Sequence, residues 1–92
     1  MSMRVLIYMQ VGDASGLSAA NQIRSIAFEM RVPITVQMVT EASQLKMSGI
    51  DTFPTVSIDG LTISMGYVPS RIEIRRAIEQ RQHQLAAGRP PE

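Results

Sequence analysis

The chain has 92 residues, a length that suits one domain with a single hydrophobic core. Hydrophobic residues make up 45% of it and its formal net charge is +1, so no strong electrostatic attraction to nucleic acid or to a membrane surface is expected. It contains no cysteine, which excludes disulfides, thiolate catalysis and thiolate metal sites.

The first half of the chain predicts a strand, a helix and a second strand. The apolar run 5–9 has the length of a strand that is covered on both faces. A glycine-rich loop over 10–16 follows it. The apolar positions of the helix then recur three or four residues apart: Leu17, Ala20, Ile23, Ala27 and Met30. Pro33 ends this helix, and residues 34–38 alternate between apolar and polar, as in a strand.

The middle of the chain predicts a short helix and a hairpin. Thr40 is placed to cap a helix over 41–47, and Gly49 is placed to end it. Asp59-Gly60 separates two alternating runs, which is a strong signal for a β-hairpin.

A last helix is expected to begin at a capping box. In this box the Ser70 hydroxyl accepts from a helix N–H, while the Glu73 side chain reaches back to the start of the helix. Its buried stripe is expected to contain Ile74, Ala77, Ile78 and Leu85. The polar, proline-ended segment 86–92 is typical of a disordered tail, so the predicted domain spans residues 1–85.

The resulting order of elements is β-α-β-α-β-β-α. The first two strands flank a helix, so they are expected to be parallel with a right-handed crossover, and the last two form an antiparallel hairpin. The sequence therefore predicts an α/β fold with a mixed four-stranded sheet and helices on both faces.

The stretch 49–74 resembles the small thioredoxin-like and glutaredoxin-like proteins of the redox-active disulfide type. It carries a proline loop, Thr52-Phe53-Pro54, followed by the hairpin and by a Met65-Gly66 step before the last helix. In pattern, the resemblance extends over roughly residues 4–80. It implies a minimal thioredoxin-like fold in which Pro54 is cis.

That family places a Cys-x-x-C motif at the start of the first helix, where this chain has Asp13-Ala14-Ser15-Gly16. Counting back from the proline without gaps puts the two cysteines at Asp13 and Gly16, and a slip of one residue puts them at Gly12 and Ser15. Thiol–disulfide exchange needs a thiolate that attacks a sulfur atom. A serine hydroxyl is not ionised at neutral pH, and a carboxylate is a poor nucleophile toward disulfides. We therefore expect no disulfide oxidoreductase activity.

Two interpretations of residues 13–16 stay open. Asp13 and Ser15 are favoured N-cap types, worth about 1 kcal/mol each, and an aspartate suits the positive end of a helix. Helix entry is therefore the favoured interpretation. The alternative is the binding of glutathione or another small thiol, with the Ser15 hydroxyl bonded to the sulfur, as serine does at this place in some glutathione-transferase-like proteins.

The proline loop offers a second candidate surface. The resemblance implies that Phe53, the residue before the proline, exposes backbone groups that pair with a bound peptide as a short added strand. A purely structural role for Pro54 is the alternative. Tyr67 follows the Gly66 step and would extend the apolar surface near Phe53.

These observations favour a redox-inactive binding or adaptor module that contacts a protein partner through residues 13–16 and the proline loop. A glutathione-binding protein that uses Ser15 is one alternative. A homo-oligomeric structural subunit that uses its sheet edge or a methionine-rich surface is another. The short apolar run at the N-terminus does not resemble a signal peptide and no segment has the ~20 apolar residues of a membrane span, so we expect a cytoplasmic protein with no membrane partner.

The other conspicuous residues indicate no additional site. His83 is the only histidine and has no nearby ligand partners, so neither a metal nor a cofactor is expected. Arginines on the last helix are offset by glutamates, and aromatic residues make up only 4%, which argues against nucleic acid. Five methionines stand at positions expected in the core: Met9, Met30, Met38, Met47 and Met65.

Overall fold

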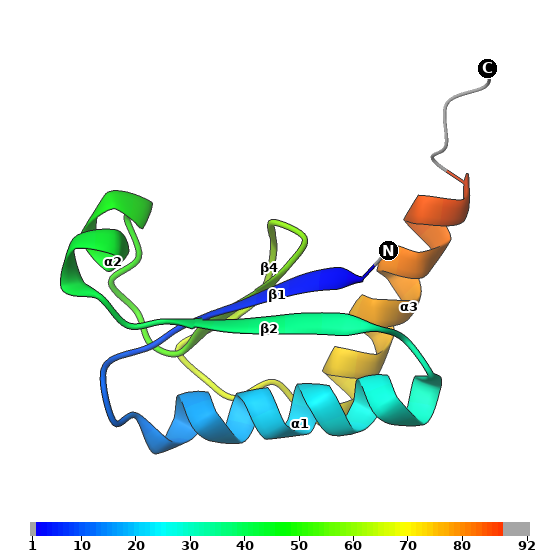
Figure 1. Ribbon diagram of the computed structural model, residues 1–92, viewed down its shortest axis with the longest axis horizontal. Coiled ribbons are helices and arrows are strands. Elements are labelled where there is room, and N and C mark those ends of the chain that lie inside the picture. Colours follow the sequence, from blue (N-terminus) through cyan, green and yellow to red (C-terminus); the bar gives the residue numbers. More distant parts are fainter. Residues whose placement is uncertain (1, 88–92) are drawn as a thin grey trace.

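A four-stranded sheet packs one of its faces against two long helices (Figure 1). The computed structural model describes residues 2–87. The elements are β1 (Met3–Tyr8), α1 (Ala14–Met30), β2 (Ile34–Val39), α2 (Ala42–Ser48), β3 (Thr55–Ile58), β4 (Leu61–Met65) and α3 (Arg71–Ala87). The predicted order β-α-β-α-β-β-α is confirmed.

The strands lie in the order β2-β1-β3-β4. β1 pairs with β2 in parallel, and the β1–β3 and β3–β4 pairs are antiparallel, so the predicted mixed sheet is also confirmed. In the central register Val5 lies between Val36 on β2 and Ile58 on β3. The side chains of these residues share one face of the sheet because opposed residues on neighbouring strands point the same way.

Alternation along β1 divides the side chains between the two faces. Val5 and Ile7 are fully buried on the face that α1 and α3 cover. Leu6 and Tyr8 point to the second face, where they line a shallow groove with Met47 of α2. Figure 1 shows α1 below the sheet and α2 above one end of it. Helices therefore lie on both faces, but α2 is short and leaves much of the second face uncovered.

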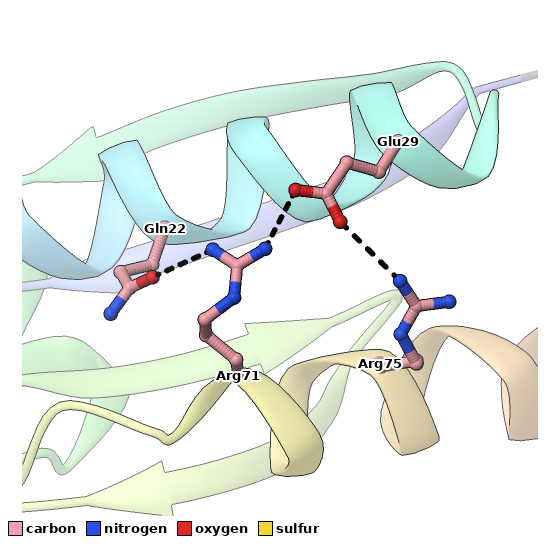
Figure 2. A network of polar contacts seen from close by, with 4 residues as sticks. All are labelled: Gln22, Glu29, Arg71 and Arg75. Carbon is pink, nitrogen blue, oxygen red and sulfur yellow. Dashed lines mark hydrogen bonds and ion pairs between the residues drawn. The ribbon is translucent and has the colours of Figure 1, made fainter.

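A network of exposed polar contacts joins α1 to α3. Figure 2 shows the Glu29 carboxylate between two guanidinium groups, at 2.6 Å from Arg71 and 3.4 Å from Arg75. Arg71 also donates a hydrogen bond of 3.4 Å to the Gln22 side chain. These contacts join the exposed sides of the two helices, while Ile23, Ile26, Ile74 and Ile78 are buried.

The predicted hairpin and the last capping box are confirmed. Asp59 and Gly60 have φ values of 49° and 87°, the positive values that a two-residue turn of this type requires. At the start of α3, Ser70 N–H donates to the Glu73 carboxylate at 2.9 Å, and Glu73 N–H donates to the Ser70 hydroxyl at 3.1 Å.

The boundaries of the first two helices differ from the expectation. α1 begins at Ala14, three residues before Leu17, and its buried stripe runs through Gly16, Ala20, Ile23 and Ala27. Leu17 lies beside this stripe and is 46% exposed. In α2 the N-cap is Glu41 and not Thr40, and no side chain caps it; Gly49 ends the helix as predicted, with φ of 70°.

The core assignment is wrong for three of the five methionines. Met38, Met47 and Met65 are 37%, 88% and 55% exposed, whereas Met9 is buried. Met38 and Met65 belong to the two edge strands, and Met47 of α2 lines the shallow groove on the second face of the sheet. Burial at these positions needs a neighbouring element that the fold does not provide.

α3 extends farther than the sequence indicated. It continues through Ala86 to Ala87, two residues of the predicted tail, and Leu85 near its end is 46% exposed and not buried as predicted. The remaining part of the predicted tail, residues 88–92, lies outside the described residues. Within the described part, no helix is both long enough and apolar enough to cross a membrane.

Candidate functional site

Three loops meet at the carboxyl end of β1. Tyr8, the last residue of β1, is opposite Thr55, the first residue of β3, so the chain just after β1 adjoins the proline loop. The Gly66 N–H donates to Pro54 C=O at 2.8 Å, which ties the loop after β4 to the same place. In Figure 1 this is the left end of the sheet, where the chain turns from β1 into α1.

Asp13 is the N-cap of α1. Its side chain accepts from Ser15 N–H at 2.9 Å, and its own N–H donates to Gln10 C=O at 3.1 Å. Ala14 and Ser15 are both exposed in the first turn. Helix entry is therefore a role that Asp13 fills in the structure, while the Ser15 hydroxyl makes no hydrogen bond to another residue in the range 2–87.

Gly16, the fourth residue of the segment, is buried against Met9. A Cβ atom built on Gly16 would lie 2.5 Å from Met9 Sδ and 2.9 Å from Met9 Cβ. Both distances are shorter than real carbon contacts allow, so a cysteine at position 16 would require Met9 to move. The methionine occupies the space that a side chain at this position would need.

In the proline loop, the backbone groups of one residue, Phe53, have no hydrogen-bond partner among residues 2–87. The Phe53–Pro54 peptide bond is cis, Pro54 is buried and Phe53 is half-buried. The Thr52 C=O accepts from the Thr55 hydroxyl at 2.6 Å, and Pro54 C=O accepts from Gly66. In contrast, neither the N–H nor the C=O of Phe53 takes part in a hydrogen bond among residues 2–87.

Tyr67 is held in place next to this loop by Glu73. Tyr67 is 47% exposed, and its hydroxyl donates to the Glu73 carboxylate at 3.0 Å. The Ser70 N–H bond, followed by the Tyr67 hydroxyl bond, lowers the pKa of Glu73. The bond to the ionised carboxylate is the main reason that the pKa of Tyr67 is raised. The tyrosine is therefore a protonated donor with a fixed ring orientation.

Two apolar residues of this region were missed in the sequence. Val11 lies in the loop before α1 and is 84% exposed, and Met65 is opposite Thr55 on β4. An apolar residue inside a glycine-rich loop was the available signal for Val11. The alternation at Met65 predicts burial, because the sequence does not show that β4 is an edge strand.

Among residues 2–87 there is no group of three or more histidine, aspartate or glutamate side chains that could hold a metal ion. A cavity of about 760 Å³ lies at the other end of β1, between the hairpin and the end of α3. None of the candidate residues lines it.

Comparison with known proteins identifies similar structures but no family. No protein-family model and no curated protein matches the chain. A malarial protein has 10% sequence identity and a TM-score of 0.65, with 87% of this chain and 97% of that chain covered. A protein of unknown function from Staphylococcus aureus has 11% identity and a TM-score of 0.67, with 90% and 94% covered. These two similarities show the fold alone.

A glutaredoxin is also among the similar structures. Glutaredoxin 1 from Francisella tularensis, solved as a complex with cacodylate, is 18% identical with a TM-score of 0.45, and 89% of this chain and 99% of that chain are covered. This similarity is too low to place the chain in the glutaredoxin family. Since the chain has no cysteine, it cannot carry out thiol–disulfide exchange.

Proposed function

We propose that this chain is a redox-inactive binding module of thioredoxin-like fold that holds an extended segment of a protein partner at the proline loop. The observation that supports this most directly is the free N–H and C=O of Phe53 beside an exposed Tyr67. A module of this kind holds its partner and transfers no electrons. The loop at residues 13–16 forms the other side of the binding surface.

The backbone of Phe53 supplies the directional part of the contact. A peptide that lies alongside it can donate one hydrogen bond and accept another, as an added strand does. Each such bond contributes only about 0.5–1.5 kcal/mol net. Backbone pairing therefore orients the peptide but leaves most of the affinity to apolar contacts.

Tyr67 and Val11 supply those apolar contacts. The Tyr67 ring is fixed by the Glu73 hydrogen bond, so it loses little conformational freedom on binding. Rigid aromatic side chains of this kind are frequent at the centre of protein interfaces. Val11 is 84% exposed and adds apolar area at the start of α1.

Affinity capture with a double variant tests this proposal. Phe53→Ala with Tyr67→Ala removes the apolar surface, whereas Leu61→Ala with Leu85→Ala removes two leucines that are 53% and 46% exposed elsewhere. We expect the first pair to lose a partner that the wild-type chain captures from its source cells, and the second pair to retain it. Equal capture of that partner by all three proteins would contradict the proposed surface.

Ser15 supports a second candidate function, the binding of glutathione. Its hydroxyl is exposed in the first turn of α1 and has no hydrogen-bond partner among the described residues. Titration calorimetry with glutathione should then give a measurable heat that Ser15→Ala reduces. Absence of heat up to millimolar ligand would rule this candidate out.

A further inference from the structure

β2 is an edge strand with no protective device. It pairs only with β1, and its sequence from Ile34 to Val39 contains no charged residue, proline or glycine. Natural sheets usually protect such edges with charges, prolines or bulges, because unpaired backbone groups bind other strands. We infer that two copies of this chain pair through β2 and join their sheets into one.

The ladder with β1 decides which backbone groups of β2 are free. Met3 N–H donates to Pro33 C=O at 3.0 Å, and Met9 N–H donates to Val39 C=O at 3.1 Å. Residues of a parallel strand alternate between facing their neighbour and facing away from it. The odd-numbered residues therefore bond to β1, and Ile34, Val36 and Met38 direct both N–H and C=O outward.

These three residues determine the register of the pair. In an antiparallel arrangement with a two-fold axis at Val36, each Val36 faces its own copy and each Ile34 faces Met38 of the second copy. Every outward N–H and C=O of both strands then has a partner. The paired strands also place no like charges opposite each other, since β2 carries none.

This register also matches apolar side chains with apolar side chains. Ile34, Val36 and Met38 share the face of the sheet that α1 covers. On that face a groove of about 270 Å³ opens at the edge of the sheet, lined in part by Phe28, Ile34 and Val36. Phe28 is 85% exposed on α1. Met38 of the second copy would lie next to this groove and would cover part of it.

The second edge of the sheet fits this role less well. The ladder between β3 and β4 shifts register at the Val56/Ser57 step, so β4 is not a regular strand along its whole length. Irregularities of this kind bend a strand and interrupt the row of free backbone groups. Met65 on β4, which is 55% exposed, therefore offers a matched control for Met38, which is 37% exposed.

Measurement of the molar mass in solution tests the pairing. Light scattering after size exclusion should give the wild-type chain twice its monomer mass. Met38→Lys places a charge at the interface and should raise the dimer dissociation constant at least about tenfold. Met65→Lys should leave it unchanged. A wild-type monomer at every concentration, or an equal effect of both lysines, would overturn the inference.

An introduced cysteine tests the register, because the natural chain has none. Opposed residues of a hydrogen-bonded pair have Cα atoms about 5.5 Å apart, within the range that a disulfide can span. Val36→Cys should form a disulfide-linked dimer under mild oxidation, whereas Thr62→Cys on β4 should not. A dimer whose Val36→Cys form stays unlinked would contradict this pairing. The Phe53→Ala, Tyr67→Ala protein should still dimerise, which separates this inference from the proposed function.

Discussion

The Met9 side chain packs directly against Gly16 at the start of α1. A Cβ atom on Gly16 would lie only 2.5 Å from Met9 Sδ, so the thioether fills the space that this atom would need. A chain that carried a cysteine at this position would need a different side chain or a different path at residue 9. The packing of Met9 therefore leaves no room for a side chain at position 16.

Gly16→Ala should destabilise the protein by about 1–2 kcal/mol. Overpacking typically costs about 1–3 kcal/mol, and the higher helix propensity of alanine offsets up to about 1 kcal/mol of it. Urea unfolding measures the difference, with the exposed Ser18→Ala as control. In a Met9→Ala background the same glycine substitution should cost less. Unchanged or increased stability of the single Gly16→Ala variant would show that the Met9 side chain can move aside without a cost in free energy.

At the scale of elements, the contact between α1 and α3 combines two different interactions. Isoleucine side chains from both helices form the buried layer, and Ile23 and Ile74 are fully buried in it. The Glu29 network lies outside this layer, with its side chains about half exposed: 46% for Glu29, 50% for Arg71 and 47% for Arg75. Apolar burial therefore provides most of the stabilisation, and the exposed ion pairs add little to it.

Glu29→Gln removes the carboxylate from both ion pairs in Figure 2. Because the pairs are exposed, the free energy of unfolding should fall by no more than about 1 kcal/mol. The loss should shrink at about 1 M salt, where the screening length is near 3 Å. Urea unfolding of the two proteins at low and high salt measures this effect, and Glu79→Gln, which is in none of the described ion pairs, is the control. A loss that salt does not change would contradict an electrostatic origin.

At the scale of the whole molecule, Asp59 joins three parts of the chain. From the hairpin turn its carboxylate accepts from Arg4 N–H at 2.7 Å and from Arg81 Nε at 2.9 Å. It thereby connects β1 and α3 to the β3–β4 hairpin. Partial burial by itself would raise the pKa of Asp59, but the Arg4 N–H bond and the Arg81 guanidinium together hold it below its ordinary value.

Asp59→Asn should lower the free energy of unfolding at neutral pH by about 1–2 kcal/mol, since bonds to a charged group are lost while partial exposure reduces their worth. Asparagine tolerates the positive φ at this turn, so the backbone is not strained. The carboxyl group has a lowered pKa in the folded state. Its contribution is therefore complete above the unfolded value of about 3.9 and is lost as the pH falls through the folded value.

The difference between the wild type and Asp59→Asn should thus be constant from neutral pH down to about pH 5 and should decrease below about pH 4. Urea unfolding at a series of pH values measures it. Asp51→Asn is a suitable control, because Asp51 accepts only from the adjacent Thr52 side chain among the described contacts. A difference that grows as the pH falls would contradict the sign of this linkage.

The sequence by itself determined the order of the elements, the hairpin at Asp59-Gly60, the capping box at Ser70 and the impossibility of thiol chemistry. Each of these depends on a few neighbouring residues or on composition alone, so it can be predicted without knowing which distant segments meet. The candidate residues at 13–16, 53–54 and 67 were also named from local patterns.

Only the tertiary structure decided which apolar residues are covered. Alternation predicts that Met38 and Met65 lie on a sheet, but their exposure depends on β2 and β4 being the edges of that sheet. The meeting of Gly16 with Met9, and of Gly66 with the proline loop, likewise depends on strand pairing between distant segments. Periodicity shows which way a side chain points, whereas burial is decided by the element that packs against it.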